Sequence, residues 1–245
     1  MKKIKIFVAC DTNSLKKVNQ IISQTKNKKI DIIPKFGMQF FYSKKGRSFL
    51  EKFKKDYWLD LKFCDVPNTA SSAIESLKDL KKCKYLTAHA AGGLQMLKVI
   101  KKKSKKINKN IKVLGVTILT SLDNSDIKRI GYTKKINKIV LKQANLIKKA
   151  GCDGIICSPQ EALLVRKKYK KFIIITPGIR LPGDKKNDQS RVLTPYKAIV
   201  ENKVSSIVMG RSLVSGNIKK NVIRLINHLN LWFIQKYVGS LTLIP

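Results

Sequence analysis

The chain has 245 residues, of which 43% are hydrophobic, so it is long enough to bury a core without help from disulfides or metals. Its formal net charge is +37, from 45 lysines and 7 arginines against 15 acidic residues. Because the lysines are spread through every polar segment and arginine is scarce, we attribute the charge to drift in an AT-rich genome rather than to a nucleic-acid site. The field would still attract a small anionic substrate.

Short β-rich apolar runs recur at even spacing along the chain. They are continuous, rich in β-branched residues and too short to be helices, which is typical of buried parallel strands. The predicted strands are 4–11, 30–37, 57–63, 84–90, 112–120, 153–159, 172–178 and 205–211.

Segments with helical periodicity separate most of these runs, for example 14–26, 70–82 and 135–151. A mostly loop-like stretch follows residue 178, a short helix is predicted near 194–202, and 219–239 predicts a closing amphipathic helix. Eight strands that alternate with helices predict an α/β fold, a single (β/α)₈ TIM barrel over residues 1–245. A doubly wound sheet is less favoured because no glycine-rich dinucleotide motif is present.

Polar residues gather where the predicted strands end, and these ends share one rim of a barrel, where active sites are built. Thr120 and Ser121 are expected to close the fifth strand, and His89 lies on the fourth. A single histidine without neighbouring ligand residues predicts a hydrogen-bonded interior side chain. The other candidates are Asp11, Lys35, Asp60, Lys62, Arg180, Gly210 and Arg211.

The stretch YWLDLKFCDVPNTA, residues 57–70, places two carboxylates around one lysine in a chain that is poor in carboxylates. Asp60 and Lys62 are two residues apart, so both side chains are expected on one face of the strand, with Asp65 in the following loop. Nearby negative charge favours the protonated form of lysine, so Lys62 could deliver a proton to a carbanion. A carboxylate beside it would disfavour a substrate carboxylate and be relieved once that group leaves as CO₂.

DLKFCDVPNT, residues 60–69, resembles the signature of the orotidine 5′-phosphate decarboxylase family, Asp-x-Lys-x-x-Asp followed by Ile or Val, Pro, Asn and Thr. The resemblance continues in order through FVACD, PKFGMQFF, LTAHAAGG, GVTILTS, GIICSPQEA, TPGIR with NDQSRVLTP, and IVMGRSL. It implies a bacterial-type barrel enzyme that converts orotidine 5′-monophosphate to UMP and CO₂ in pyrimidine biosynthesis, with no cofactor and no metal.

The resemblance also implies roles for single residues. Lys35, Asp60, Lys62 and Asp65 would form an alternating charge network. In it, Lys62 would protonate C6 of the pyrimidine, and Asp60 would lie beside the departing CO₂. Asp65 and Thr69 would reach into the active site of the partner subunit of a homodimer. The remaining implied roles are ribose binding by Asp11 and Lys35, pyrimidine contacts by Thr120 and Ser121, a base-to-phosphate bridge by Gln189, phosphate binding by Gly210 and Arg211, and loop support by Arg180.

Two positions depart from the family pattern. Cys64 stands where the family most often has histidine, and Phe36 replaces a commoner aliphatic residue. Two other functions stay open: a Mg²⁺-dependent sugar-phosphate decarboxylase or aldolase that shares the Asp-x-Lys-x-x-Asp core, and a basic nucleic-acid-binding protein that uses the barrel as a scaffold.

Five cysteines without a CxxC pair predict neither a disulfide framework nor a zinc site. No signal-peptide pattern is present, and no apolar run approaches the roughly 20 residues that a membrane span needs. We therefore expect a cytoplasmic protein with no membrane partner and no specific nucleic-acid partner.

Overall fold

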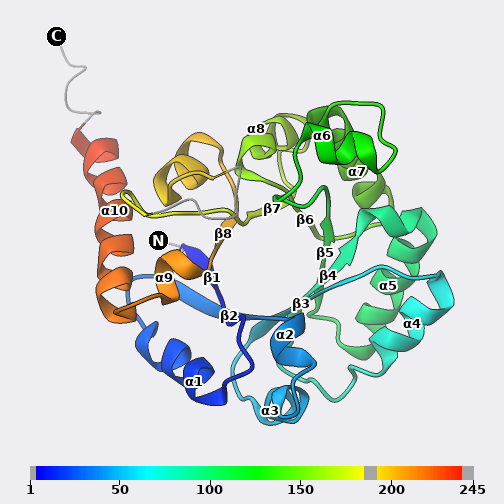
Figure 1. Ribbon diagram of the computed structural model, residues 1–245, viewed down its shortest axis with the longest axis horizontal. Coiled ribbons are helices and arrows are strands. Elements are labelled where there is room, and N and C mark those ends of the chain that lie inside the picture. The colour runs from blue at the N-terminus through cyan, green and yellow to red at the C-terminus, as the bar shows by residue number, and fades with distance from the viewer. Residues whose placement is uncertain (1–3, 185–191, 239–245) are drawn as a thin grey trace.

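The computed structural model describes residues 4–184 and 192–238 and shows a closed barrel of parallel strands surrounded by helices (Figure 1). The strands lie in chain order around the barrel, as the repeated strand–helix pattern predicts. They are β1 (Lys5–Ala9), β2 (Asp31–Gly37), β3 (Tyr57–Phe63), β4 (Cys83–His89), β5 (Lys112–Val116), β6 (Gly154–Ile156), β7 (Ile173–Thr176) and β8 (Ser206–Met209).

Helices cover the outside of the barrel between successive strands (Figure 1). They are α1 (Leu15–Gln24), α2 (Met38–Phe41), α3 (Gly46–Lys52), α4 (Pro67–Glu75), η1 (Ala90–Gly92), α5 (Gly93–Ile107), α6 (Asn124–Arg129), α7 (Ile136–Lys149), α8 (Pro159–Lys168), the π-helical η2 (Lys197–Glu201), α9 (Arg211–Val214) and α10 (Ile218–Val238). The closing helix α10 packs on α9 and α1.

Alternation along each strand divides the core into two parts. On β1, Phe7 faces the barrel interior, whereas Ile6 and Val8 face the helices. The interior cluster includes Trp58 and Tyr85, which both meet Phe7 edge to face. Because this cluster fills the barrel, it forms a floor rather than a pore.

The fifth strand is shorter than predicted. β5 ends at Val116, and one further backbone hydrogen bond joins the Thr117 N–H to the carbonyl of Ile156, the last residue of β6. With no more of β6 to pair with, the chain leaves the sheet, so the expectation that Thr120 and Ser121 close the strand is wrong. Both residues lie in the loop that follows β5.

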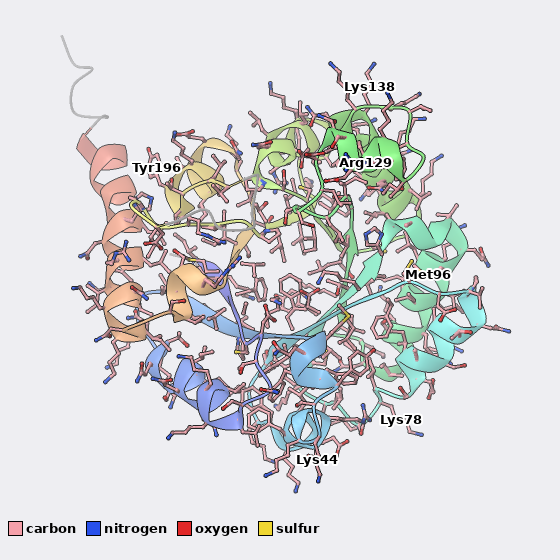
Figure 2. All side chains as sticks on the ribbon, viewed as in Figure 1. Lys44, Lys78, Met96, Arg129, Lys138 and Tyr196 are labelled. Atoms are coloured by element: carbon pink, nitrogen blue, oxygen red, sulfur yellow. The ribbon has the colours of Figure 1, made fainter. Side chains whose placement is uncertain are left out.

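The excess positive charge points outward. Lys44, Lys78 and Lys138 are exposed and project from the outer edge of the molecule (Figure 2). Within the described ranges, no helix has the length and apolar character needed to cross a membrane.

Candidate active site

A cavity of about 680 Å³ opens at the carboxyl ends of the strands. Its lining side chains come from β1, β2, β3 and β5–β8 or from the segments that follow them. Trp58, Val116, Ile156 and Val208 from the interior cluster give it an apolar floor. Charged residues lie around this floor, and all but Lys17 form two groups.

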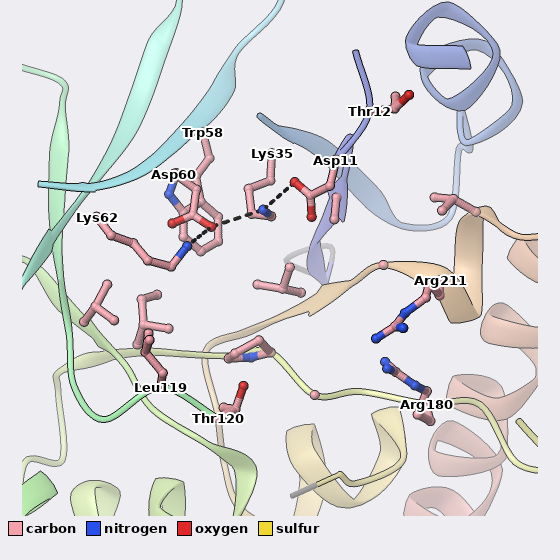
Figure 3. Close-up of a pocket in the computed structure, with 18 of the residues that line it drawn as sticks. Asp11, Thr12, Lys35, Trp58, Asp60, Lys62, Leu119, Thr120, Arg180 and Arg211 are labelled. Atoms are coloured by element: carbon pink, nitrogen blue, oxygen red, sulfur yellow. Dashed lines mark hydrogen bonds and ion pairs between the residues drawn. The ribbon is translucent and has the colours of Figure 1, made fainter. Parts of the chain in front are cut away.

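The first group is a row of alternating charges (Figure 3). The Nζ atom of Lys35 lies 3.2 Å from Oδ1 of Asp11 and 3.1 Å from Oδ2 of Asp60. The Nζ atom of Lys62 lies 3.0 Å from the same Oδ2 atom. Three strands therefore bring together four of the residues that the sequence singles out, in the order Asp11, Lys35, Asp60 and Lys62.

Burial and charge act in opposite directions on this row. Burial disfavours the charged forms of both Lys35 and Asp60. For Asp60 it is outweighed by Lys35 and Lys62, which hold the pKa of its carboxyl below the ordinary value. For Lys35 it is outweighed by Asp60 and Asp11, which raise the pKa of the ammonium group. Lys35 and Asp60 are therefore both ionised near neutral pH.

Thr87 on β4 holds the row in place, although nothing in the sequence pattern marks it as a site residue. Its side chain is fully buried, and its hydroxyl donates to Oδ1 of Asp60 at 2.9 Å. The Thr87 hydroxyl oxygen in turn accepts the backbone N–H of Lys62, also at 2.9 Å. Thr87 thus orients the carboxylate and fixes the backbone of the neighbouring lysine.

The backbone at Lys62 is unusual, because its φ of 51° lies in the left-handed region that non-glycine residues rarely adopt. The pairing of β3 with β4 is irregular here, since Leu59 pairs with Leu86 but Phe63 pairs with Ala88. A bulge, and not the regular alternation assumed from the sequence, sets the direction of the Lys62 side chain. Strain of this kind is common at functional sites.

Gly37 provides the space that the row needs. A Cβ atom at this position would lie 2.6 Å from Oδ1 of Asp11 and 3.7 Å from Nζ of Lys35. Any larger residue would push the Asp11 carboxylate out of its present position.

The second charged group lies at the opposite side of the cavity, where Arg180 and Arg211 direct their guanidinium groups toward one another (Figure 3). Arg180 is buried and follows β7, whereas Arg211 is exposed and begins α9. Burial, then the charge of Arg211, lowers the pKa of Arg180. Two converging guanidinium groups make this end suited to an anion such as a phosphate group.

The other predicted residues divide into three sets. Thr120 and Gly210 line the cavity. Asp65, Thr69 and Ser121 are exposed and do not line it. Gln189 lies outside the described residues. Conversely, Thr12 and Lys17 line the cavity but were not predicted, because each is an ordinary polar residue near the start of a helix.

Asp65, expected in the charge network, is not part of the row within its own chain and turns back on its own loop. Its Oδ1 atom accepts the N–H of Val66 at 2.7 Å, and its backbone N–H contacts the Met96 sulfur at 3.4 Å. The neighbouring Cys64 is exposed, whereas Phe36 is buried in an aromatic cluster with Phe40, Phe49, Phe53 and Tyr57. Phe36 is thus a packing change that does not touch the charged row.

His89 at the end of β4 is half-buried, and its Nδ1 atom accepts the N–H of Ala91 at 3.2 Å. Burial, then the charge of Lys62, lowers its pKa. Among the described residues, no group of three or more His, Cys, Asp or Glu side chains could hold a metal ion. His89 is accordingly a hydrogen-bonded residue beside the site.

Comparison with known proteins agrees with this geometry. The sequence model of the orotidine 5′-phosphate decarboxylase / HUMPS family matches residues 5–226. Proteins named orotidine 5′-phosphate decarboxylase are similar to the chain: one from Coxiella burnetii is 36% identical over 219 residues, covering 85% of this chain and 89% of that protein. One from Fusobacterium nucleatum is 37% identical over 234 residues, covering 94% and 96%.

A solved structure is similar as well. The crystal structure of orotidine 5′-phosphate decarboxylase from Lactobacillus acidophilus has a TM-score of 0.77 at 28% identity, over 93% of this chain and 100% of that chain. The family match spans most of the chain, and the fold agrees with it. The chain belongs to the orotidine 5′-phosphate decarboxylase / HUMPS family.

Proposed function

We propose that the chain decarboxylates orotidine 5′-monophosphate to UMP and CO₂ without a cofactor. The observation that carries this proposal is the row Asp11, Lys35, Asp60 and Lys62 beside an apolar floor, with the Arg180 and Arg211 guanidinium groups across the cavity. The arginines would take the phosphate group, and the row would take the ribose and the reacting end of the pyrimidine.

The chemistry follows from the charges in the row. The ionised Asp60 would lie beside the substrate carboxylate and repel it, and this repulsion ends when the C6–carboxyl bond breaks and CO₂ leaves. The electron pair of that bond stays on C6 as a poorly stabilised carbanion. Lys62 stabilises this charge with its ammonium group and then gives C6 a proton, which it regains from water. Thr87 and Lys35 keep Asp60 in position throughout.

Binding energy from the phosphate group would assist this step. The phosphate is remote from C6, so its contacts do not change during the reaction, but they can hold the reacting carbon against the row. Gly210 would let the backbone approach the phosphate, and Thr120 would contact the pyrimidine, because both line the cavity. The roles of Ser121 and Gln189 stay predictions.

We also propose a homodimer in which Asp65 and Thr69 complete the partner's site. Both are exposed and lie outside the cavity of their own chain. Large apolar side chains are exposed in the segments that follow the adjacent strands β2 and β3: Met38 is 49% exposed, Tyr42 72% and Val66 62%. Apolar groups exposed around one rim support an interface there.

Mixing two inactive variants tests the shared site. A dimer of one Lys62→Ala chain and one Asp65→Ala chain contains one site with both residues intact, so a statistical mixture should regain about a quarter of wild-type activity. Mixing Lys62→Ala with the Lys62→Ala/Asp65→Ala double variant should regain none. Equal, negligible activity in both mixtures would contradict the shared site.

We propose one domain over residues 1–245, because the described strands close into a single barrel. We also propose a cytoplasmic location, for which the cysteines are the support. Four of the five cysteines are buried free thiols, and all five are unpaired, which is typical of a reducing compartment.

The test of the function is product analysis with and without metal. Orotidine 5′-monophosphate should yield UMP at the same rate in EDTA and in Mg²⁺. Activity that requires Mg²⁺, or turnover of a sugar phosphate in its place, would favour the sugar-phosphate branch instead.

A further inference from the structure

Helix α10 reaches the segment that follows β7 through one arginine. The Nη2 atom of Arg224 donates to the carbonyl of Pro182 at 3.0 Å and to Oδ1 of Asp184 at 2.9 Å. The two charged side chains are 39% and 21% exposed. Asp184 is therefore held by a cation from a helix that contributes nothing to the lining of the main cavity.

The second carboxylate oxygen of Asp184 is also engaged. It accepts the hydroxyl of Ser212, whose own oxygen accepts the N–H of Leu181 at 2.9 Å. Leu181 directly follows Arg180, and Ser212 directly follows Arg211. One short network thus joins the backbones that carry the two arginines of the anion-binding end.

Asp184 lies close enough to influence Arg180. Burial and the repulsion from Arg211 both lower the pKa of Arg180. The negative charge of Asp184 is the third influence in size, and it raises that pKa. Arg180, Arg211, Asp184 and Arg224 also line a smaller cavity of about 330 Å³ that adjoins the main one. A carboxylate at this place competes with an anionic ligand for the two guanidinium groups.

We propose that Arg224 is a positioning residue of the anion-binding end, which holds Asp184 away from Arg180 and Arg211 so that they bind phosphate. This inference rests on the proposed function for the identity of the substrate, but it concerns phosphate binding alone. If Arg224 acts by holding the Asp184 charge, removing that charge should make Arg224 dispensable for phosphate binding. An arginine that only supports the fold would still be needed.

The experiment titrates the full-length protein with inorganic phosphate by calorimetry. Arg224→Met should weaken phosphate binding about tenfold, because the released carboxylate pairs with Arg180 or Arg211. Asp184→Asn alone should bind phosphate at least as tightly as wild type. The double variant Asp184→Asn/Arg224→Met should return to within about threefold of wild type, and Arg224→Lys should retain most of the affinity.

Arg47→Met is the matched control. It removes an arginine of similar exposure that pairs with Asp79 on the outside of the barrel, and it should leave phosphate binding unchanged. Asp184→Asn decides the matter even if Arg224→Met does not fold, since weaker binding by this variant would overturn the proposal. Weak binding by the double variant would overturn it too. Failure of wild type to turn over orotidine 5′-monophosphate would contradict the proposed function and leave the phosphate titration valid.

Discussion

The Nζ atom of Lys62 and the Nζ atom of Lys35 contact the same oxygen of Asp60, at 3.0 and 3.1 Å. One carboxylate therefore bridges two ammonium groups, while its other oxygen accepts the Thr87 hydroxyl. This arrangement leaves Asp60 little freedom to move away from an approaching carboxylate. It also holds Lys62 at the cavity wall, where a proton donor would be needed.

Replacing Thr87 tests how far the row depends on its buried hydroxyl. Thr87→Val should cost about 2 kcal/mol of unfolding free energy, because a buried carboxylate oxygen loses its donor. It should also lower the decarboxylation rate roughly tenfold as Asp60 and Lys62 lose their orientation. Urea denaturation and initial rates measure the two effects.

Thr117→Val is the control for this change. Thr117 is equally buried, and its hydroxyl donates to the Ile156 carbonyl at 2.9 Å, an oxygen that keeps a backbone donor. This variant should cost about 1 kcal/mol and retain wild-type activity. Equal losses of activity in both variants would mean that Thr87 acts through general packing.

The left-handed backbone of Lys62 predicts a trade of stability for function. Lys62→Gly should be about 1 kcal/mol more stable than Lys62→Ala, because only glycine adopts this φ without strain. Both variants should lack activity. Lys203 has the same φ of 51° but does not line the cavity. The unfolding free energy of Lys203→Gly should therefore exceed that of Lys203→Ala by a similar amount, and both variants should keep their activity. Equal stability of the Gly and Ala variants at both positions would contradict the prediction that the left-handed backbone is strained.

The difference in stability between wild type and Asp60→Asn should depend on pH. The pKa of Asp60 is lowered in the folded state from an ordinary value of 3.8, so its charge stabilises the fold above that pH, and the contribution is lost as pH falls through the folded value. Asp60→Asn should be about 3 kcal/mol less stable at pH 7. The difference in unfolding free energy between wild type and Asp60→Asn should narrow below pH 3.8.

Urea denaturation of both proteins across this pH range checks the prediction. Asp56→Asn, an exposed change just before β3, should stay within about 0.5 kcal/mol of wild type at pH 7. A gap between wild type and Asp60→Asn that stays constant down to pH 2.5 would show that Asp60 gains no stabilisation from its two lysines.

Much of the barrel could be predicted because its strands are continuous apolar runs, and the charged residues stand out at their ends. The gathering of Asp11, Lys35, Asp60 and Lys62 follows from that placement and the shared rim. The short helices α2 and α3 were not predicted, since four and seven residues are too few to show helical periodicity.

The unpredicted parts of the site depend on tertiary contacts. Thr87 looks like an ordinary β-branched strand residue until β3 and β4 are paired. The bulge at Lys62 arises from that same pairing and has no glycine to mark it. Arg224 and Asp184 are 40 residues apart, so no local pattern could connect them.

The most direct test of the central claim is release of labelled CO₂ from carboxyl-labelled orotidine 5′-monophosphate in EDTA, by wild type and by Lys62→Ala. We expect one CO₂ for each UMP formed by wild type, and a rate about a thousandfold lower for Lys62→Ala, with the variant still folded. No CO₂ from wild type, or an equal rate from both proteins, would contradict it.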